Sequence, residues 1–316
     1  MRFKIEEDTN IFDDKTNCIH GNFLQTSSWG KLKQYEGWTP LNIIFYDSEL
    51  VIGYAIALVR KQSFFKIMYI PRGPIVEDFK YLEEVINTLK SIAEKQGCSM
   101  LKIEPDIEYK EEYLDYFKNF KISKKIIQPL ATGILNLKLT EEELIKNIES
   151  KKRVRVRNKF NLEFKREDEN IEGFYSIHKK TSENQNFKTR SMEYFKRIKD
   201  IFQNNIRVYC VYKDNKLISS SFNIIYKDTI TYLYSGSNKE YNNMYPGYHL
   251  VFQTALASKK EGLLYFDLWG VGEQEKWKGF SDFKINLAPS IKNYLGSFDL
   301  PLKKSHYFIF NLLSKR

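Results

Sequence analysis

The order of predicted elements repeats along this chain, and the repeat is the strongest constraint on its fold. In the first half, residues 81–96 (YLEEVINTLKSIAEKQ) place apolar side chains at helical spacing, a glycine ends the helix, and the strand SMLKIEP follows. In the second half, the strand TITYLYSGS is followed by a turn, a helix over residues 250–260, a glycine and the strand LLYFDLWG. Each last strand carries an acid near its end, Glu104 or Asp267. We therefore predict an α/β (α+β) fold of two similar units, each a mixed sheet flanked by helices.

The length of 316 residues suits two domains, each large enough to bury its own core. Between the repeats, residues 140–160 are predicted to be helical, because a capping box and a group of acids open this segment. We place the domain boundary before this helix. The first domain then covers residues 1–139 and is completed by the C-terminal tail 297–316, and the second covers 140–296. No linker rich in Pro, Gly or Ser separates them, so we expect tight docking and a functional cleft between the domains.

The formal net charge of +10 favours an anionic partner, such as a nucleic acid, a nucleotide-sugar or an acidic membrane face. Ordinary solvated lysines explain the excess equally well. The three cysteines, Cys18, Cys98 and Cys210, are far apart and odd in number, so we expect reduced thiols. The histidines and cysteines lack metal-ligand spacing, and we expect no metal site. No apolar run is long enough for a membrane span, which predicts a cytoplasmic protein.

The turn before the second helix lacks most of the glycines that a phosphate-binding turn needs. In an acetyltransferase of the GNAT type, which this repeat resembles, a Gly-rich turn and the following helix hold the coenzyme A pyrophosphate on exposed N–H groups. Here residues 244–249 read MYPGYH, so that only Gly247 remains, and Tyr248 and His249 would crowd a pyrophosphate. We therefore expect a different acyl donor and no cofactor.

Seven blocks of sequence resemble, in order, those of the FemABX family of non-ribosomal peptidyl transferases, which add amino acids from aminoacyl-tRNA to the stem peptide of peptidoglycan precursors. One block alone is weak, whereas seven in order are specific. The chain is similar to a compact branch of the family that lacks a helical-hairpin insertion. The blocks are FLQTSSWGKLKQYEGW (23–38), YIPRGPIV (69–76), KIEPDIEY (102–109), TRSMEYF (189–195), YLYSGSN (232–238), FDLWGV (266–271) and GFSDFKINL (279–287).

The resemblance implies two tandem GNAT-like domains and roles for individual residues. It also implies that Arg72, in the second block, belongs with the substrate-binding residues. The family's precursor-binding lysine falls on Lys33, its acid before proline on Glu104, its arginine and the tyrosine four residues later on Arg190 and Tyr194, its tyrosine before the Gly-Ser turn on Tyr234, and its functionally important lysine on Lys284. 

Three positions depart from the family pattern. Glu104 stands where the family usually has Asp, which is a mild change. Ser99 stands where some relatives have a substrate-facing Tyr, and Trp269 replaces the first Gly of a Gly-Gly pair. We expect the last two changes to reshape the acceptor pocket.

The chemistry of acyl transfer asks for such residues independently of the resemblance. The acceptor amine, with a pKa of about 10.4, must lose a proton in order to attack the tRNA ester. Glu104 could orient this amine or take its proton, or could merely cap a turn. Lys284 could stabilise the oxyanion of the tetrahedral intermediate or contact the 3′-terminal phosphates of tRNA. No Ser-His-Asp or Cys-His pair is in view, so direct aminolysis is the simpler mechanism.

The remaining candidates are cations and aromatic residues. Arg190 and Lys33 suit a precursor that carries a diphosphate and carboxylates. Without the resemblance, Lys33 and Lys284 would be solvated surface lysines, and Tyr194 and Tyr234 would be packing residues.

Two further segments have alternative interpretations. Arg153, Arg155 and Arg157 could neutralise phosphates of the tRNA acceptor stem or lie on a solvated helix face. The tail HYFIFNLLSKR (306–316) could rest on the inner membrane face, whereas a strand or helix returning to the first domain is the favoured interpretation.

Together these features predict a monomeric aminoacyltransferase that builds a peptidoglycan cross-bridge. Its expected partners are aminoacyl-tRNA and an acceptor amine on UDP-MurNAc-pentapeptide or on a lipid-linked muropeptide. The alternatives are an acyl-CoA-dependent N-acyltransferase and a non-catalytic RNA- or membrane-associated binding protein.

Overall fold

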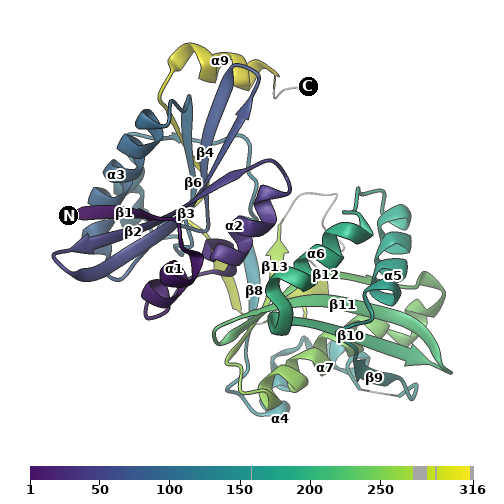
Figure 1. Cartoon of the computed structure of the whole chain (residues 1–316). Coiled ribbons are helices and arrows are strands. Elements are labelled where there is room, and N and C mark those ends of the chain that lie inside the picture. The colour runs from purple at the N-terminus through teal and green to yellow at the C-terminus, as the bar shows by residue number, and fades with distance from the viewer. Residues whose placement is uncertain (158, 273–282, 289, 314–316) are drawn as a thin grey trace. The chain divides into compact units, whose positions relative to one another are not determined.

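The computed structural model of the chain describes residues 1–157, 159–272, 283–288 and 290–313. It divides the chain into two units (Figure 1). Unit 1 contains Met1–Leu130 and Asn293–Arg316, and unit 2 contains Ala131–Lys292. The division after Leu130 precedes the boundary expected after Leu139, because the strand that follows pairs inside the sheet of unit 2. The predicted cleft between the domains stays a prediction.

The sheet of unit 1 is mixed. Most neighbouring strands are antiparallel, whereas β4 and β6 run parallel. The strand order is β1-β2-β3-β4-β6-β15-β7, and β5 pairs with β3. The strands are β1 (Arg2–Glu6), β2 (Thr39–Asp47), β3 (Leu50–Gln62), β4 (Phe65–Pro71), β5 (Ile75–Val76), β6 (Met100–Glu104), β7 (Lys121–Ile122) and β15 (Phe298–Pro301).

Helices cover both faces of this sheet because successive side chains of its central strands point to opposite sides and both sets are apolar. The helix α3 (Leu82–Lys95) buries its apolar stripe against one face, as its sequence predicts. On the other face, α1 (Thr9–Thr16) places Phe12 edge-on to Tyr54 of β3, with ring centroids 5.8 Å apart. The helix α2 (Ser27–Gln34) contacts β2 and β3.

The sheet of unit 2 is also mixed, with strand order β14-β8-β13-β12-β11-β10-β9. Only β12 and β13 among its described pairs are parallel. The strands are β8 (Ala131–Asn136), β9 (Glu163–Arg166), β10 (Ile206–Lys213), β11 (Lys216–Tyr226), β12 (Thr229–Ser237), β13 (Tyr265–Val271) and β14 (Ser290–Asn293).

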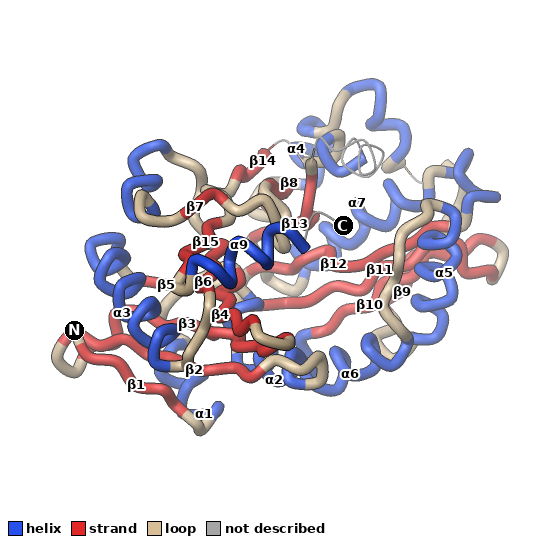
Figure 2. Tube along the Cα trace, turned by 90° about the horizontal axis from the view of Figure 1, so that it is seen from above, coloured by secondary structure: helices blue, strands red, loops and turns tan. Residues whose placement is uncertain are grey.

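Two layers of helix enclose this second sheet (Figure 2). The helix α7 (Pro246–Lys260) packs Leu250, Val251 and Phe252 into a core with residues of β10 and β13. On the opposite face, Phe174 of α5 (Ile171–Asn184) meets Phe195 of α6 (Met192–Phe202) at 5.1 Å. Both units thus contain one helical crossover between parallel strands, β4-α3-β6 and β12-α7-β13, and the predicted pair of mixed sheets with flanking helices is confirmed.

The predicted helix over residues 140–160 is shorter than expected. The capping box of Thr140 and Glu143 is present and opens α4 (Glu141–Asn147). Ile148 then turns extended, and residues Ser150–Arg155 form the 3₁₀ helix η4. Repulsion among the closely spaced cations of this second segment disfavours a longer α-helix. The prediction was therefore wrong for the basic half.

The C-terminal segment completes the sheet of unit 1. Strand β15 lies between β6 and β7, and Asp299 accepts a hydrogen bond from the buried Lys102 of β6 at 3.0 Å. After β15, the helix α9 (Lys304–Leu313) packs Tyr307 against Phe65 and Met100, where β4 and β6 begin. Because removal of one partner would leave a buried charge unpaired, the Lys102–Asp299 pair ties the last strand firmly to β6.

Candidate functional site

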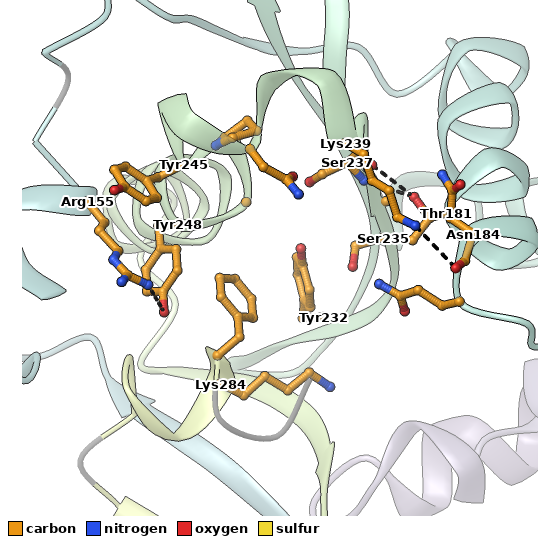
Figure 3. Close-up of a pocket in the computed structure, with 16 residues that line it drawn as sticks. Arg155, Thr181, Asn184, Tyr232, Ser235, Ser237, Lys239, Tyr245, Tyr248 and Lys284 are labelled. Carbon is orange, nitrogen blue, oxygen red and sulfur yellow. Dashed lines mark hydrogen bonds between the residues drawn. The ribbon is translucent and has the colours of Figure 1, made fainter. Parts of the chain in front are cut away.

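A pocket of about 540 Å³ opens in unit 2 at the end of β12. It lies between the C-terminal end of α5 and the N-terminal end of α7, which is where the Gly-poor turn of the sequence folds (Figure 3). The lining side chains that matter below come from five segments and are Arg155, Thr181, Tyr232, Tyr245, Tyr248 and Lys284.

A β-bulge in β12 gives two neighbouring tyrosines different surroundings. Phe222 of β11 pairs with Tyr234 and Asn223 pairs with Tyr232, which leaves Leu233 as the extra residue. Tyr232 consequently joins the core on the α7 side and lines the pocket. Tyr234 instead meets Phe195 of α6 at 4.9 Å. Burial raises the pKa of the Tyr232 hydroxyl, which therefore stays protonated as a donor at the pocket wall.

Gly236 lets β12 end directly against α5. A Cβ atom at this position would lie 2.8 Å from the carbonyl oxygen of Ile177 and 2.9 Å from Cα of His178. The close approach lets the Thr181 hydroxyl accept a hydrogen bond from the Ser237 amide at 3.0 Å. The Ser-Gly-Ser sequence thus fixes the strand end that forms one wall of the pocket.

Lys284, which follows β13 in the chain, is a half-buried cation that lines the pocket. Its Nζ donates to the carbonyl oxygen of Gly270 at 3.0 Å. Burial lowers the pKa of Lys284 to about 8, and the nearby carboxylate of Asp267 opposes part of this shift. Asp267 itself accepts hydrogen bonds from the Thr132 hydroxyl and the Trp269 amide. The protonated and neutral forms of Lys284 are therefore both accessible near neutral pH.

Arg155 and three aromatic rings form the wall next to Lys284. The guanidinium of Arg155 lies 5.0 Å from the ring centroid of Tyr245 and 5.1 Å from that of Tyr248, and it donates to the Tyr248 hydroxyl at 3.2 Å. The ring of Tyr248 meets Phe283 edge-on at 4.7 Å. Because Phe283 precedes Lys284, this chain of contacts links Arg155 to the position of the lysine.

Three other candidates in unit 2 come together. The Arg190 guanidinium lies 4.9 Å from the ring centroid of Tyr194, whose ring is 6.5 Å from that of Tyr234. Arg190 lies just outside α6, because Ser191 is the N-cap residue. His178 packs against Tyr234 and donates from Nδ1 to the Ser235 carbonyl at 2.7 Å. This buried histidine holds the end of β12 against α5, and sequence reasoning did not identify it.

The other two basic residues of the run have different surroundings. Arg153 donates to the carbonyl oxygens of Ile148 and Lys146 at 2.9 and 2.7 Å, and so caps the end of α4. Arg157 is exposed. Of the three predicted tRNA-binding arginines, only Arg155 lines the pocket.

Lys33, in unit 1, is almost buried. Its Nζ lies 2.8 Å from a carboxylate oxygen of Glu36 and 4.4 Å from the ring centroid of Trp29. A substrate anion that binds Lys33 would therefore compete with Glu36 for the ammonium.

Glu104 does not have the surroundings of a general base. The residue is 1% exposed. Its Oε1 accepts from the Ile127 amide at 2.8 Å and the Ser297 hydroxyl at 2.9 Å. Its Oε2 accepts from the Tyr69 hydroxyl at 2.5 Å and the Gln128 amide at 3.0 Å. With four donors around a buried carboxylate, the structure favours the structural role, in which Glu104 holds two loops to the end of β6.

Arg72 is similarly engaged inside unit 1. It is 2% exposed, donates to the Pro129 carbonyl at 2.6 Å and stacks on Tyr294 at 3.4 Å from the ring centroid. These contacts join three segments of unit 1, and the expected role of Arg72 in substrate binding stays a prediction.

The departures from the family pattern have distinct structural settings. Trp269 has a φ of 58°, a conformation that favours glycine, and its amide is held by Asp267 at 2.7 Å. Ser99 is buried and hydrogen-bonds to Nδ1 of His306 in α9 at 2.9 Å. The last sequence block is only partly described, because residues 279–282 lie outside the described residues.

Sequence reasoning missed several residues of the pocket. Thr181 and Asn184 come from the end of α5, and Lys239 donates to the Asn184 carbonyl at 3.3 Å. No motif marked them, since they reach the pocket through the packing of α5 on β12.

The described part of the chain lacks two kinds of feature, a cluster of metal ligands and a membrane-spanning helix. It contains no group of three or more His, Cys, Asp or Glu side chains that could hold a metal ion. Among the same residues, no helix combines the length and apolar character that a membrane crossing requires.

Comparisons with known sequences identify relatives of the chain. A model of the FemAB family matches residues 6–132, 116–216 and 211–315. The lipid II:glycine glycyltransferase of Staphylococcus haemolyticus is 29% identical over 200 residues, which cover 57% of this chain and 48% of that protein. For the Staphylococcus aureus protein of the same name, the values are 29% over 200 residues, 57% and 47%. The chain thus spans about half the length of the curated relatives it matches.

Comparisons with solved structures concern the fold. The crystal structure of FemX matches with a TM-score of 0.87 at 20% identity, covering 98% of this chain and 99% of that one. A tandem GNAT protein from the clavulanic acid biosynthesis pathway matches with a TM-score of 0.55 at 10% identity, covering 94% and 97%. The predicted tandem GNAT-like fold is confirmed.

Proposed function

The chain belongs to the FemAB family, and on this premise we propose that it transfers an amino acid from aminoacyl-tRNA to an amine on the stem peptide of a peptidoglycan precursor. The pocket at the N-terminal end of α7 is the single observation that most supports this function in the present chain. It combines a helix end that favours anions with a half-buried lysine and a cation-aromatic wall.

We propose that this pocket takes the aminoacylated 3′ end of tRNA. Tyr248 lines the pocket at the first turn of α7, where a coenzyme A pyrophosphate would need close access to the backbone. A single-stranded nucleotide suits an aromatic wall better, because bases stack on tyrosine and arginine planes. Arg155 and Lys284 supply positive charge for the terminal phosphates.

The proposed reaction is direct aminolysis. The acceptor nitrogen attacks the ester carbonyl carbon, and the resulting oxyanion accepts a hydrogen bond from the ammonium of Lys284. The carbon–oxygen bond of the ester then breaks and the amide forms. The proton that the neutral amine loses goes to the leaving ribose oxygen, which becomes the free hydroxyl of the tRNA end. Four donors already occupy the carboxylate of Glu104, so we no longer propose it as the base.

The acceptor side of the proposal rests on Arg190, Tyr194, Tyr234 and Lys33. Arginine and lysine suit the diphosphate and carboxylates of a muropeptide precursor, and the tyrosines offer hydroxyl groups beside Arg190. The acceptor is UDP-MurNAc-pentapeptide or its lipid-linked form, and charged tRNA places the reaction in the cytoplasm.

A transfer assay tests this function. Wild type and Lys284→Met are incubated with tRNAs charged with glycine, alanine or serine and with each acceptor form. We expect a new amide from at least one charged tRNA and a rate at least about 100-fold lower in Lys284→Met, as for loss of an oxyanion donor. Lys260→Met, an exposed change on α7, serves as the matched control.

Two results would count against the proposal. Full activity in Lys284→Met would remove this residue from the mechanism. The absence of transfer from every charged tRNA to both acceptors would contradict the proposed function itself. Calorimetric binding of coenzyme A would then favour the alternative acyl-CoA-dependent N-acyltransferase.

A further inference from the structure

The helix α9 has one face packed on unit 1 and one face in solvent. Phe310 stacks on Phe65 of β4 with ring centroids 4.7 Å apart, and Tyr307 is buried beside it. On the outer face, Phe308 is 69% exposed and Leu312 is 60% exposed. Lys304, Phe308 and Leu312 are each four residues apart and therefore form one row along the helix. The packed face holds the helix in place, so the apolar outer row is a fixed feature of the surface.

Four chain segments lie next to α9, and they are residues 60–66, 97–100, 118–128 and 299–303. Asp299, their one acid, is 1% exposed and paired with Lys102. Phe64 from the first segment meets His306 edge-on at 5.4 Å. Lys121 and Lys125 from the third lie over the rings of Tyr307 and Phe310 at 5.2 and 5.4 Å. Among the described residues of these segments and of α9, every exposed charged side chain is therefore basic.

We propose that this surface docks on an anionic lipid bilayer, with the apolar row entering the interface and the lysines contacting the headgroups. An exposed apolar helix face with basic flanks is the pattern of a surface-lying membrane helix. We name it the α9 patch, and it consists of Phe64, Lys121, Lys125, Lys303, Lys304, Phe308, Ile309 and Leu312.

The sign of the charge decides between a membrane and a second copy of the chain. A twofold contact through the α9 patch would place the same lysines opposite one another, and like charges across an interface are unfavourable. An anionic bilayer offers the complementary charge, because each lysine near such a surface contributes about 1 kcal/mol of attraction. The inference does not depend on the proposed transfer reaction, since lipid binding needs neither tRNA nor a muropeptide.

Vesicle flotation with the full chain tests the docking. The probes are vesicles of phosphatidylcholine alone and of phosphatidylcholine with phosphatidylglycerol. We expect binding to the anionic vesicles that weakens as salt rises. The double variant Phe308→Ser with Leu312→Ser should lower the partition coefficient at least about tenfold. Leu50→Ser, which alters a side chain 61% exposed at the start of β3, is the matched control.

A second variant, which removes positive charge and keeps Phe308 and Leu312, tests the contribution of the lysines separately. Lys303→Gln with Lys304→Gln removes two of the four lysines of the α9 patch, so it should weaken binding to the anionic vesicles by roughly tenfold and lower its salt dependence by about half. Equal binding to both vesicle types, no binding to either, or binding unchanged by both variants would overturn the inference. So would a dimer, seen by sedimentation, that disappears in the Phe308 and Leu312 variant, because a second copy would then cover the patch.

Discussion

At the residue scale, Lys284 differs from a surface lysine in its pKa, which is lowered. Its pKa of about 8 is set by burial, with partial compensation from Asp267. The lowered pKa also affects stability. In the unfolded chain Lys284 has an ordinary lysine pKa, so burying its charged form lowers the free energy of unfolding.

The pH dependence of stability follows from this shift. Between about pH 8 and 10.5 the unfolded chain binds more protons at Lys284 than the folded chain does, so the free energy of unfolding rises with pH in this window. Lys284→Met should therefore raise the free energy of unfolding by about 1–3 kcal/mol at pH 7, with the gain fading toward pH 10.5. Urea unfolding measured across this pH range checks it. A pH-independent difference, such as we expect for Lys260→Met, would contradict the shift.

Glu104 offers a second test at this scale. Replacing its carboxylate by an amide in Glu104→Gln turns an NH2 group toward two of the four donors, so we expect a loss of about 2–3 kcal/mol in the free energy of unfolding. Glu112→Gln, at an exposed position, is the control. A variant of unchanged stability but severely reduced transfer rate would instead restore Glu104 as a reacting group.

The contacts of Glu104 and Arg72 were the hardest to predict from sequence, for a physical reason. Their partners come from residues 127–129 and 294–297, which are distant in the chain and carry no motif that announces the contact. A carboxylate at a strand end has the same local sequence whether it faces a substrate or a loop. Arg190 and Tyr194 do lie together, but Arg190 precedes the N-cap of α6, so helical spacing does not explain their contact.

At the element scale, the crossover helices α3 and α7 were predictable because their own residues define them. Each places apolar side chains at helical spacing and is followed by a glycine with positive φ, Gly97 or Gly262. The bulge at Leu233 and the early end of α4 left no such local signal. The bulge arises from the pairing of β12 with β11, and only that pairing explains why Tyr232 and Tyr234 have different surroundings.

Gly236 and Gly247 both line the pocket, and substitutions at them test two different things: the packing of β12 on α5 and the access of substrate to the pocket. Gly236→Ala would drive a methyl group into the backbone of α5, and we expect it to lower the free energy of unfolding by about 1–3 kcal/mol. At Gly247 a Cβ atom would meet its nearest neighbour, Oγ of Ser237, at an ordinary 3.4 Å. Gly247→Ala should therefore change stability by less than about 1 kcal/mol, while its methyl group on the pocket wall slows transfer.

Paired measurements of denaturation and of transfer rate distinguish these effects. Equal loss of stability in both glycine variants would contradict the close approach of β12 to α5. Full transfer activity in Gly247→Ala would show that the substrate does not approach the first turn of α7.

At the scale of the whole molecule, unit 1 is assembled from two distant parts of the chain, and unit 2 lies between them in sequence. Strand β15 has neighbours on both sides, β6 and β7. The sheet of unit 1 is therefore continuous only when the C-terminal segment is in place.

A truncation tests this dependence. A chain that stops after Lys292 lacks β15 and leaves the buried Lys102 without Asp299. We expect hydrogen exchange to show lost protection across β6 and its neighbours in unit 1 and retained protection in β10–β13 of unit 2. A chain that stops after Lys303 keeps β15 and serves as the control. Retained protection of β6 in the shorter chain would contradict this account.

The same arrangement reverses the order in which the two units can mature during synthesis. The ribosome releases the strands of unit 2 before it has made β15, so unit 2 can close its sheet while unit 1, although translated first, still waits for its missing strand. The nascent N-terminal half therefore exposes the unpaired edge of β6 throughout the translation of unit 2, and this interval is when the chain most needs protection by a chaperone.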